Sequence, residues 1–211
     1  VAEFRKPEFQ VEVSTAKPAY VNGESIDVST EATFYFGGPL TSAPVDWSVM
    51  AAPYSIRPEG FERYSFTDYD YWRQSTSETP IRATGTAATG NDGVARFQVP
   101  AALQANESSM MFTISATVTD SNAQVVASSA SVSVHPGQVL PGIRPAEYVA
   151  EAKKAAQIDL VTVDTDGKPL PDRPVAVKVY QRKWVTTKEQ PPEGARRYRS
   201  EPVATLIATL A

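Results

Sequence analysis

The chain is dominated by short stretches in which apolar and polar residues alternate. Residues 9–13 and 94–99 alternate in this way, and other stretches carry apolar residues at every second position: Ile26, Val28, Ala32, Phe34 and Phe36; Val45, Trp47 and Val49; Phe112, Ile114, Ala116 and Val118. A period of two is typical of a strand with one buried face. Turn-forming residues such as Asn22-Gly23 and 90–93 separate the stretches. This pattern predicts an antiparallel β-sandwich of about seven short strands, with Phe34, Phe36, Trp47, Phe97, Phe112 and Ile114 buried together.

A pattern of strand, Gly-Pro turn and strand occurs twice. The first copy contains Tyr20, residues 36–40 (Phe-Gly-Gly-Pro-Leu), Pro44-Val45 and Val49. The second contains Tyr148, residues 166–170 (Asp-Gly-Lys-Pro-Leu), Pro174-Val175 and Val179. From the Pro-Leu onward the copies align without a gap, and before it they differ by a two-residue insertion or deletion. A repeat this long indicates two tandem domains of one family, with Pro39 and Pro169 in equivalent turns.

The repeat divides the chain into three parts. Residues 1–7 are predicted to be a linker or the end of a preceding domain. Residues 8–136, the first copy, form a sandwich with an aromatic-rich insertion at about 53–86. Residues 137–211, the second copy, form another sandwich with strands at 158–163, 175–179 and 206–210 and a polar hairpin or loop at 183–200. The second copy is predicted to be truncated at its C-terminus, because it has no counterpart of 91–97 or of the strand pair that ends at Val134.

One segment of the second copy is open to two interpretations. Residues 145–156 have a composition that favours a helix. Their repeat partner, residues 18–23, contains Pro and Asn-Gly and is non-helical. The repeat therefore favours an irregular segment over a helix.

Composition and charge exclude several classes of function. The net charge is −4 and no basic patch is present, which argues against a nucleic-acid partner. The chain has no cysteine, so disulfides, thiolate zinc sites and a Cys nucleophile are excluded. No apolar run reaches the roughly 20 residues of a membrane helix, so no membrane insertion by this chain is expected. The single histidine, His135, is predicted to lie on the surface where a strand ends before Pro136-Gly137.

The insertion carries the strongest candidate for a binding surface. Exposed aromatic side chains in a loop are common in protein and sugar recognition. The alternative is that they cover the end of the sandwich or pack on a neighbouring domain. The candidate protein-contact residues are Phe61, Tyr64, Phe66, Tyr69, Tyr71 and Trp72.

No catalytic, cofactor or metal site is predicted. Asp68 and Asp70 are too few oxygen ligands to indicate Ca²⁺. Asp164, Asp166 and Asp172 surround the second Gly-Pro turn, where Asp side chains typically bind local backbone N–H groups. No Ser, Thr or Lys lies in a recognisable nucleophile setting.

Several motifs together resemble those of one protein family. They are Glu3-Phe4-Arg5-Lys6-Pro7-Glu8-Phe9, the turn at 34–40, the hairpin at 90–97, and residues 160–170 with the sequence Asp-Thr-Asp-Gly-Lys-Pro-Leu at their end. In this order they resemble the macroglobulin-like domains in the N-terminal half of bacterial alpha-2-macroglobulins. The resemblance implies an all-β fold of two tandem, Ig- or fibronectin-like antiparallel sandwiches.

The resemblance also implies a function for the parent protein. That function is a periplasmic or cell-envelope protease trap, a broad-spectrum endopeptidase inhibitor in which a bait segment is cleaved and a thioester then captures the protease. The thioester motif needs Cys, so neither thioester nor bait is assigned here. The chain would then be a non-enzymatic scaffold. Its partners would be neighbouring domains of the same chain, and proteases through the full-length parent.

A second hypothesis places the same fold in another functional class. Tandem sandwiches also occur in cell-surface adhesins and glycan-binding proteins, and the aromatic insertion would suit such a binding module. A Cys-x-x-Glu-Gln motif downstream in the parent would favour the inhibitor. Many near-identical repeats before a surface anchor would favour the adhesin.

Overall fold

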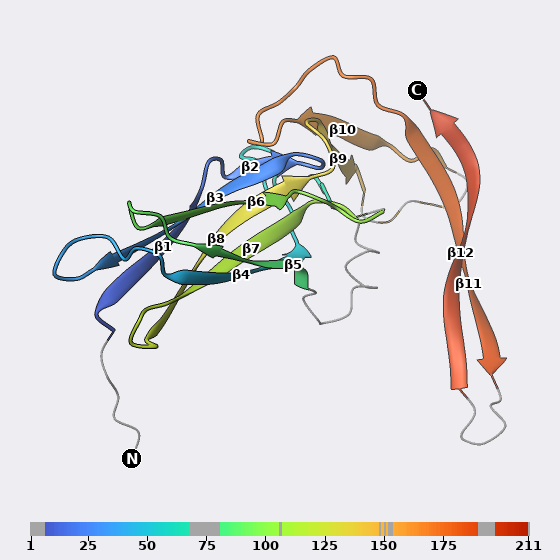
Figure 1. Ribbon diagram of the computed structural model, residues 1–211. Coiled ribbons are helices and arrows are strands. Elements are labelled where there is room, and N and C mark those ends of the chain that lie inside the picture. The colour runs from blue at the N-terminus through green and yellow to red at the C-terminus, as the bar shows by residue number, and fades with distance from the viewer. Residues whose placement is uncertain are drawn as a thin grey trace. The chain divides into compact units, whose positions relative to one another are not determined.

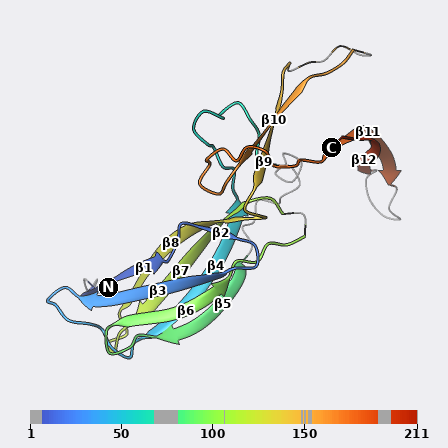
Figure 2. The same cartoon turned by 90° about the horizontal axis from the view of Figure 1, so that it is seen from above.

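The computed structural model is all-β (Figures 1 and 2). It describes residues 7–67, 81–105, 107–147, 149, 151, 154–189 and 197–210. Two compact units divide at Pro171/Asp172. The first holds β1 (Phe9–Thr15), β2 (Ala19–Val21), β3 (Ser25–Phe34), β4 (Pro44–Pro53), β5 (Ile81–Ala88), β6 (Val94–Pro100), β7 (Met110–Thr119), β8 (Val125–His135), β9 (Leu140–Pro145) and β10 (Ile158–Val163). The second holds β11 (Val177–Glu189) and β12 (Arg197–Leu210). The described residues form no helix that could cross a membrane.

Strands β1 to β8 build the predicted sandwich. One sheet has the order β1-β3-β6 and the other β2-β8-β7-β4-β5. All neighbours are antiparallel except β2 and β8, which are parallel. Every second residue of β7 is buried, as expected for a strand with one face on the core. Apolar residues of both sheets form one continuous core.

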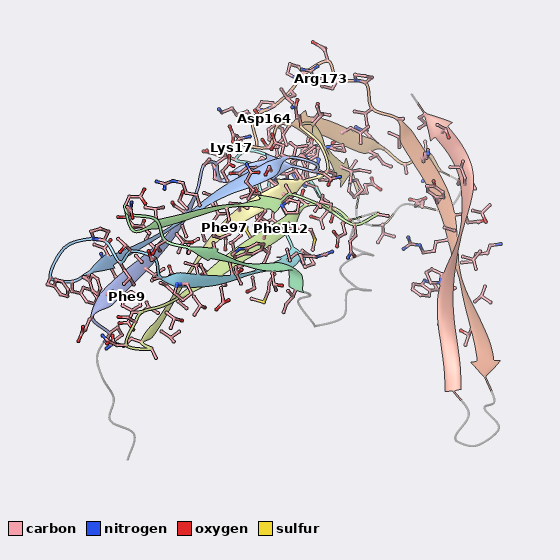
Figure 3. All side chains as sticks on the ribbon, in the orientation of Figure 1. Phe9, Lys17, Phe97, Phe112, Asp164 and Arg173 are labelled. Carbon is pink, nitrogen blue, oxygen red and sulfur yellow. The ribbon has the colours of Figure 1, made fainter. Side chains whose placement is uncertain are left out.

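Of the six residues predicted to be buried, two are buried, three are partly buried and Phe36 is exposed. Phe112 and Ile114 are buried, and Phe34, Trp47 and Phe97 pack against the core, where Trp47 and Phe97 stack with ring centroids 5.0 Å apart. Phe97 and Phe112 are labelled in Figure 3. Phe36 is 79% exposed. The period-two pattern fails there because the chain turns after Phe34, and the Gly37 N–H donates to the Phe34 carbonyl at 2.9 Å.

The two Gly-Pro turns have the same geometry, which confirms that Pro39 and Pro169 are equivalent. In the first, the Phe34 N–H donates to the Gly38 carbonyl (3.0 Å), and in the second the Asp164 N–H donates to the Lys168 carbonyl (2.9 Å). Gly37 and Gly167 have φ of 97° and 84°, conformations that favour glycine. The residues three positions after the prolines, Ser42 and Asp172, also share positive φ values, 56° and 59°.

Asp164 performs the turn role predicted for it (Figure 3). Its carboxylate accepts the N–H groups of Asp166 and Lys168, at 2.9 and 2.8 Å. This local capping is the usual reason for Asp at such a position.

Strands β9 and β10 repeat the register of β1 and β3. Leu140 pairs with Val163 as Gln10 pairs with Thr33, and every following pair corresponds in the same way, down to Pro145–Ile158 and Thr15–Val28. The residue numbers of equivalent positions differ by the same amount in these strand pairs as in the two Gly-Pro turns. The chain between the strands and the turn therefore has the same length in both copies. The two-residue insertion or deletion inferred from the sequence is wrong. The described residues between Pro145 and Ala156 form no helix.

Strands β11 and β12 form an antiparallel hairpin that corresponds to β4 and β5. The β4–β5 ladder has a bulge between Val49 and Met50, and the β11–β12 ladder has one between Val179 and Tyr180, at the equivalent position of the repeat. The residue skipped in the partner strand is Arg82 in β5 and Ile207 in β12. Within the described residues, the second copy thus contains counterparts of β1, β3, β4 and β5.

Candidate functional site

The structure assembles no metal site from the residues that it describes. No group of three or more His, Cys, Asp or Glu side chains is placed to hold an ion there. Asp68 and Asp70 lie outside the described residues. Among the chemistry-bearing side chains, the single histidine needs a closer examination because it contacts a serine.

His135 is fully buried, so its predicted surface position is wrong. The reason is that β8 runs through His135 and pairs with β2 there. Its Nδ1 lies 2.8 Å from Ser109 Oγ and its Nε2 lies 2.9 Å from Ser133 Oγ. Burial lowers the pKa of His135 below its usual value, which favours the neutral ring. Because Ser109 is also buried, this pair is inaccessible to a substrate and serves packing.

The most developed contact surface lies where the segment after β4 meets β9 and β10. We call residues 54–66 the docking segment. Its Ile56 is buried with Leu140 of β9 and Val163 of β10, and Tyr54, Phe61 and Phe66 pack against this cluster. The cluster is separate from the core of the sandwich. It therefore attaches the β9–β10 pair to the first copy through apolar burial.

Backbone pairing fixes the position of the docking segment on β9. The Ser65 N–H donates to the Ile143 carbonyl at 2.8 Å, and the Ile143 N–H donates to the Ser65 carbonyl at 2.9 Å. This reciprocal pair is an isolated antiparallel bridge. It occupies the edge of β9 that faces away from β10, so an otherwise open strand edge is satisfied.

Close approach at two glycines shapes the surface. A Cβ on Gly142 would lie 2.5 Å from Phe66 Cε1 and 2.9 Å from Val161 Cγ1. A Cβ on Gly167, in the second Gly-Pro turn, would lie 3.0 Å from Pro58 Cβ. The docking segment therefore contacts both the β9–β10 face and the repeated turn.

Substituting Gly142 with alanine should loosen this surface. The added methyl has no room beside Phe66, and such overpacking typically costs about 1–3 kcal/mol. Hydrogen exchange of the Ser65 and Ile143 amides should report the loss. Gly137→Ala is the matched control, because a Cβ there meets nothing within 4 Å. Equal exchange in both variants would contradict the close packing.

Charged side chains border the apolar cluster. Arg144 forms an ion pair with Asp159, and its guanidinium lies 4.9 Å from the centroid of the Tyr64 ring. Hydrogen bonds from Arg144 and then Gln157 lower the pKa of Asp159, and the bond to Asp159 raises the pKa of Arg144. The pair therefore favours the ionised form of both residues and aligns Arg144 on the aromatic ring.

The lowered pKa of Asp159 predicts acid sensitivity at this surface. A carboxyl group whose folded pKa is depressed stabilises the fold above about pH 4 and loses that contribution as pH falls below it. Amide NMR signals of Ser65 and Ile143, followed from about pH 6 to about pH 2, should move with acid. Asp159→Asn should abolish that movement, whereas Asp46→Asn on β4 should leave it intact. A titration that persists in Asp159→Asn would refute the assignment.

The predicted contact residues are distributed as follows. Phe61, Tyr64 and Phe66 belong to the docking segment, and Phe61 and Tyr64 pack edge to face with centroids 5.8 Å apart. Tyr69, Tyr71 and Trp72 lie outside the described residues. Whether the six residues serve a partner outside the chain stays a prediction.

The surface to which the docking segment binds was not predicted from the sequence. Leu140 and Gly142, with Val161 and Val163, share one face of β9–β10 through the pairs Leu140–Val163 and Gly142–Val161. The residues at the equivalent positions of β1 and β3 are polar: Gln10, Glu12, Glu31 and Thr33. This replacement of polar by apolar residues on an outer face was the available signal, because exposed apolar faces are usually covered.

Comparisons with known proteins agree on one family. A family model described as the bacterial alpha-2-macroglobulin MG5 domain matches residues 8–136. An alpha-2-macroglobulin homolog of Nostoc sp. is 25% identical over 186 residues, which cover 87% of this chain and 10% of that protein. The alpha-2-macroglobulin of Thermotoga maritima is 27% identical over 172 residues, 81% of this chain and 10% of that protein.

Solved structures show the same fold. Salmonella alpha-2-macroglobulin reacted with methylamine matches 99% of this chain with a TM-score of 0.69 and 12% identity, over 14% of its own length. Escherichia coli alpha-2-macroglobulin activated by porcine elastase matches 98% with a TM-score of 0.64 and 15% identity, over 19% of the solved chain. The chain thus spans about a tenth of the length of the curated relatives it matches. Since the family model covers more than half of its residues, the chain belongs to the bacterial alpha-2-macroglobulin family.

Proposed function

We propose that this chain is a structural scaffold within a bacterial alpha-2-macroglobulin-like, broad-spectrum protease inhibitor. The observation that carries the proposal is the repeated strand register, turn and bulge, which supports two tandem copies of one sandwich. In this proposal residues 8–136 and 137–211 belong to consecutive macroglobulin-like domains, and 1–7 link to what precedes them. The parent acts in the periplasm or cell envelope.

The docking surface supports a scaffold role. Its aromatic and aliphatic residues contact other parts of the same chain, and its polar groups form local hydrogen bonds and an ion pair. A surface of this kind attaches the β9–β10 pair of the second copy to the first copy. An Escherichia coli relative was solved after activation by elastase, which supports proteases as partners of the parent.

The proposal predicts that the 211-residue chain alone neither traps nor cleaves proteases. The sequence has no cysteine for a thioester, and the His135–Ser109 pair is buried. The experiment incubates the chain and the full-length parent with a panel of endopeptidases and compares them on denaturing gels. The parent should form high-mass protease complexes and the chain should not. An adduct with the isolated chain, or no inhibition by the parent, would overturn the proposal.

A further inference from the structure

Strand β11 has one open edge among the residues that the structure describes. Its only ladder there is with β12. Its counterpart β4 lies between two strands, β5 on one edge and β7 on the other. An open edge presents unpaired N–H and C=O groups and readily adds a strand.

The duplicated bulge identifies which edge of β11 is open. The bulge at Val179/Tyr180 lies in the ladder with β12, as the bulge at Val49/Met50 lies in the ladder with β5. Strand β12 therefore occupies the β5 side. The open edge corresponds to the side of β4 on which β7 pairs, from Val45–Val118 to Pro53–Met110.

We propose that the open edge of β11 is a docking site for one antiparallel strand of the β7 type. Such a strand alternates apolar residues as Met110, Phe112, Ile114, Ala116 and Val118 do in β7, all of which are buried. The ladder of β4 with β7 gives its register: it pairs Val179 with an aliphatic residue, as Val49 pairs with Ile114. This inference rests on the proposed tandem-sandwich scaffold and adds the identity of its missing contact.

The residue at the bulge indicates whether the segment just before the docked strand is charged or apolar. In the first copy Arg82 forms an ion pair with Glu107, shortly ahead of β7, and the Glu107 side chain is only 2% exposed. In the second copy the bulged residue is Ile207, and it is 61% exposed. An isoleucine cannot compensate a buried carboxylate. The docked strand must therefore carry an apolar residue where Glu107 stands.

The side chains of the hairpin agree with an absent partner. Large apolar residues of both strands are about half exposed: Tyr180, Trp184, Val185, Val203, Leu206 and Leu210. By the ladder register, Tyr180, Trp184 and Leu206 lie on one face of the hairpin and Val185, Val203 and Leu210 on the other. A β7-type strand would extend this two-stranded sheet and pack beside the β11 side chains on both faces.

A peptide can test the proposal on the 211-residue chain. The probe has the sequence of residues 107–119 with leucine in place of Glu107. Hydrogen exchange of the chain is measured with and without it. Binding at the proposed edge should slow exchange of β11 amides by about tenfold or more. Strand β4, whose two edges are occupied, is the internal control and should not change.

Two matched peptides define the outcomes. A peptide with Ile114→Pro lacks a ladder N–H and should not protect β11. A peptide that keeps Glu107 should protect it more weakly. Protection on β12 alone, or equal protection by the proline peptide, would overturn the proposal. So would protection of β11 without peptide that disappears on dilution, since the occupant would then be a second copy of the chain. Protease assays on the parent are independent of these outcomes and test the proposed function separately.

Discussion

Replacing Phe112 with alanine should lower the free energy of unfolding of the first sandwich by about 3–5 kcal/mol. Phe112 is buried in the shared core of the two sheets, so the truncation removes apolar burial and leaves a cavity. The loss would be a large part of the stability of a domain of this size. Hydrogen exchange of the β4–β7 ladder amides, measured by NMR, should report it.

Phe36→Ala is the matched control, because it deletes the same atoms from an exposed position. Phe36 contacts the ring of Phe34 at 4.8 Å between centroids, and its loss should cost less than about 1.5 kcal/mol. A similar loss in both variants would show that the core is not where the structure places it.

Replacing Glu107 with leucine should be as damaging, for an electrostatic reason. The Arg82 and Glu107 side chains are 11% and 2% exposed, and the second Glu107 oxygen accepts the Gln104 N–H at 2.7 Å. Removing one member of a buried ion pair leaves the other charge unpaired and typically costs about 3–5 kcal/mol. Urea denaturation of the variant and of the unsubstituted 211-residue chain would measure the change in the free energy of unfolding.

Restoring apolar complementarity should recover much of that stability. The double variant Arg82→Ile with Glu107→Leu carries an isoleucine at the bulge of β5. The second copy has an isoleucine, Ile207, at the equivalent bulge of β12. Well-packed apolar residues can replace a buried ion pair at little net cost. A double variant no more stable than Glu107→Leu would show that the ion pair has a role that packing cannot fill.

Local patterns predicted the elements that follow simple periodicity. The alternation of β7 and the Gly-Pro turns were read correctly, since each depends on residues close in sequence. The predicted burial of Phe36 was wrong because two residues of a turn can continue a period-two pattern by chance. The predicted surface position of His135 was wrong because its burial depends on pairing with β2, where its partner Val21 is distant in the sequence.

Strand β9 and its docking surface were harder to predict. Residues 140–145, with two prolines and a glycine, show no strand pattern, yet β9 forms because the edge that faces away from β10 needs few N–H donors. The prolines at 141 and 145 are tolerated on that edge, and Ile143 alone bonds to Ser65. The aromatic residues of the docking segment were found by composition, but their contact with β9–β10 depends on tertiary structure.

The tandem-copy scaffold requires the second copy to repeat the strand register of the first. NMR cross-strand contacts measure that register, because opposed residues on neighbouring strands lie within about 5.5 Å. We expect backbone contacts for Ile143 with Leu160 that match those for Val13 with Thr30. A β9–β10 register shifted by one residue, with Ile143 opposite Asp159 or Val161, would contradict it.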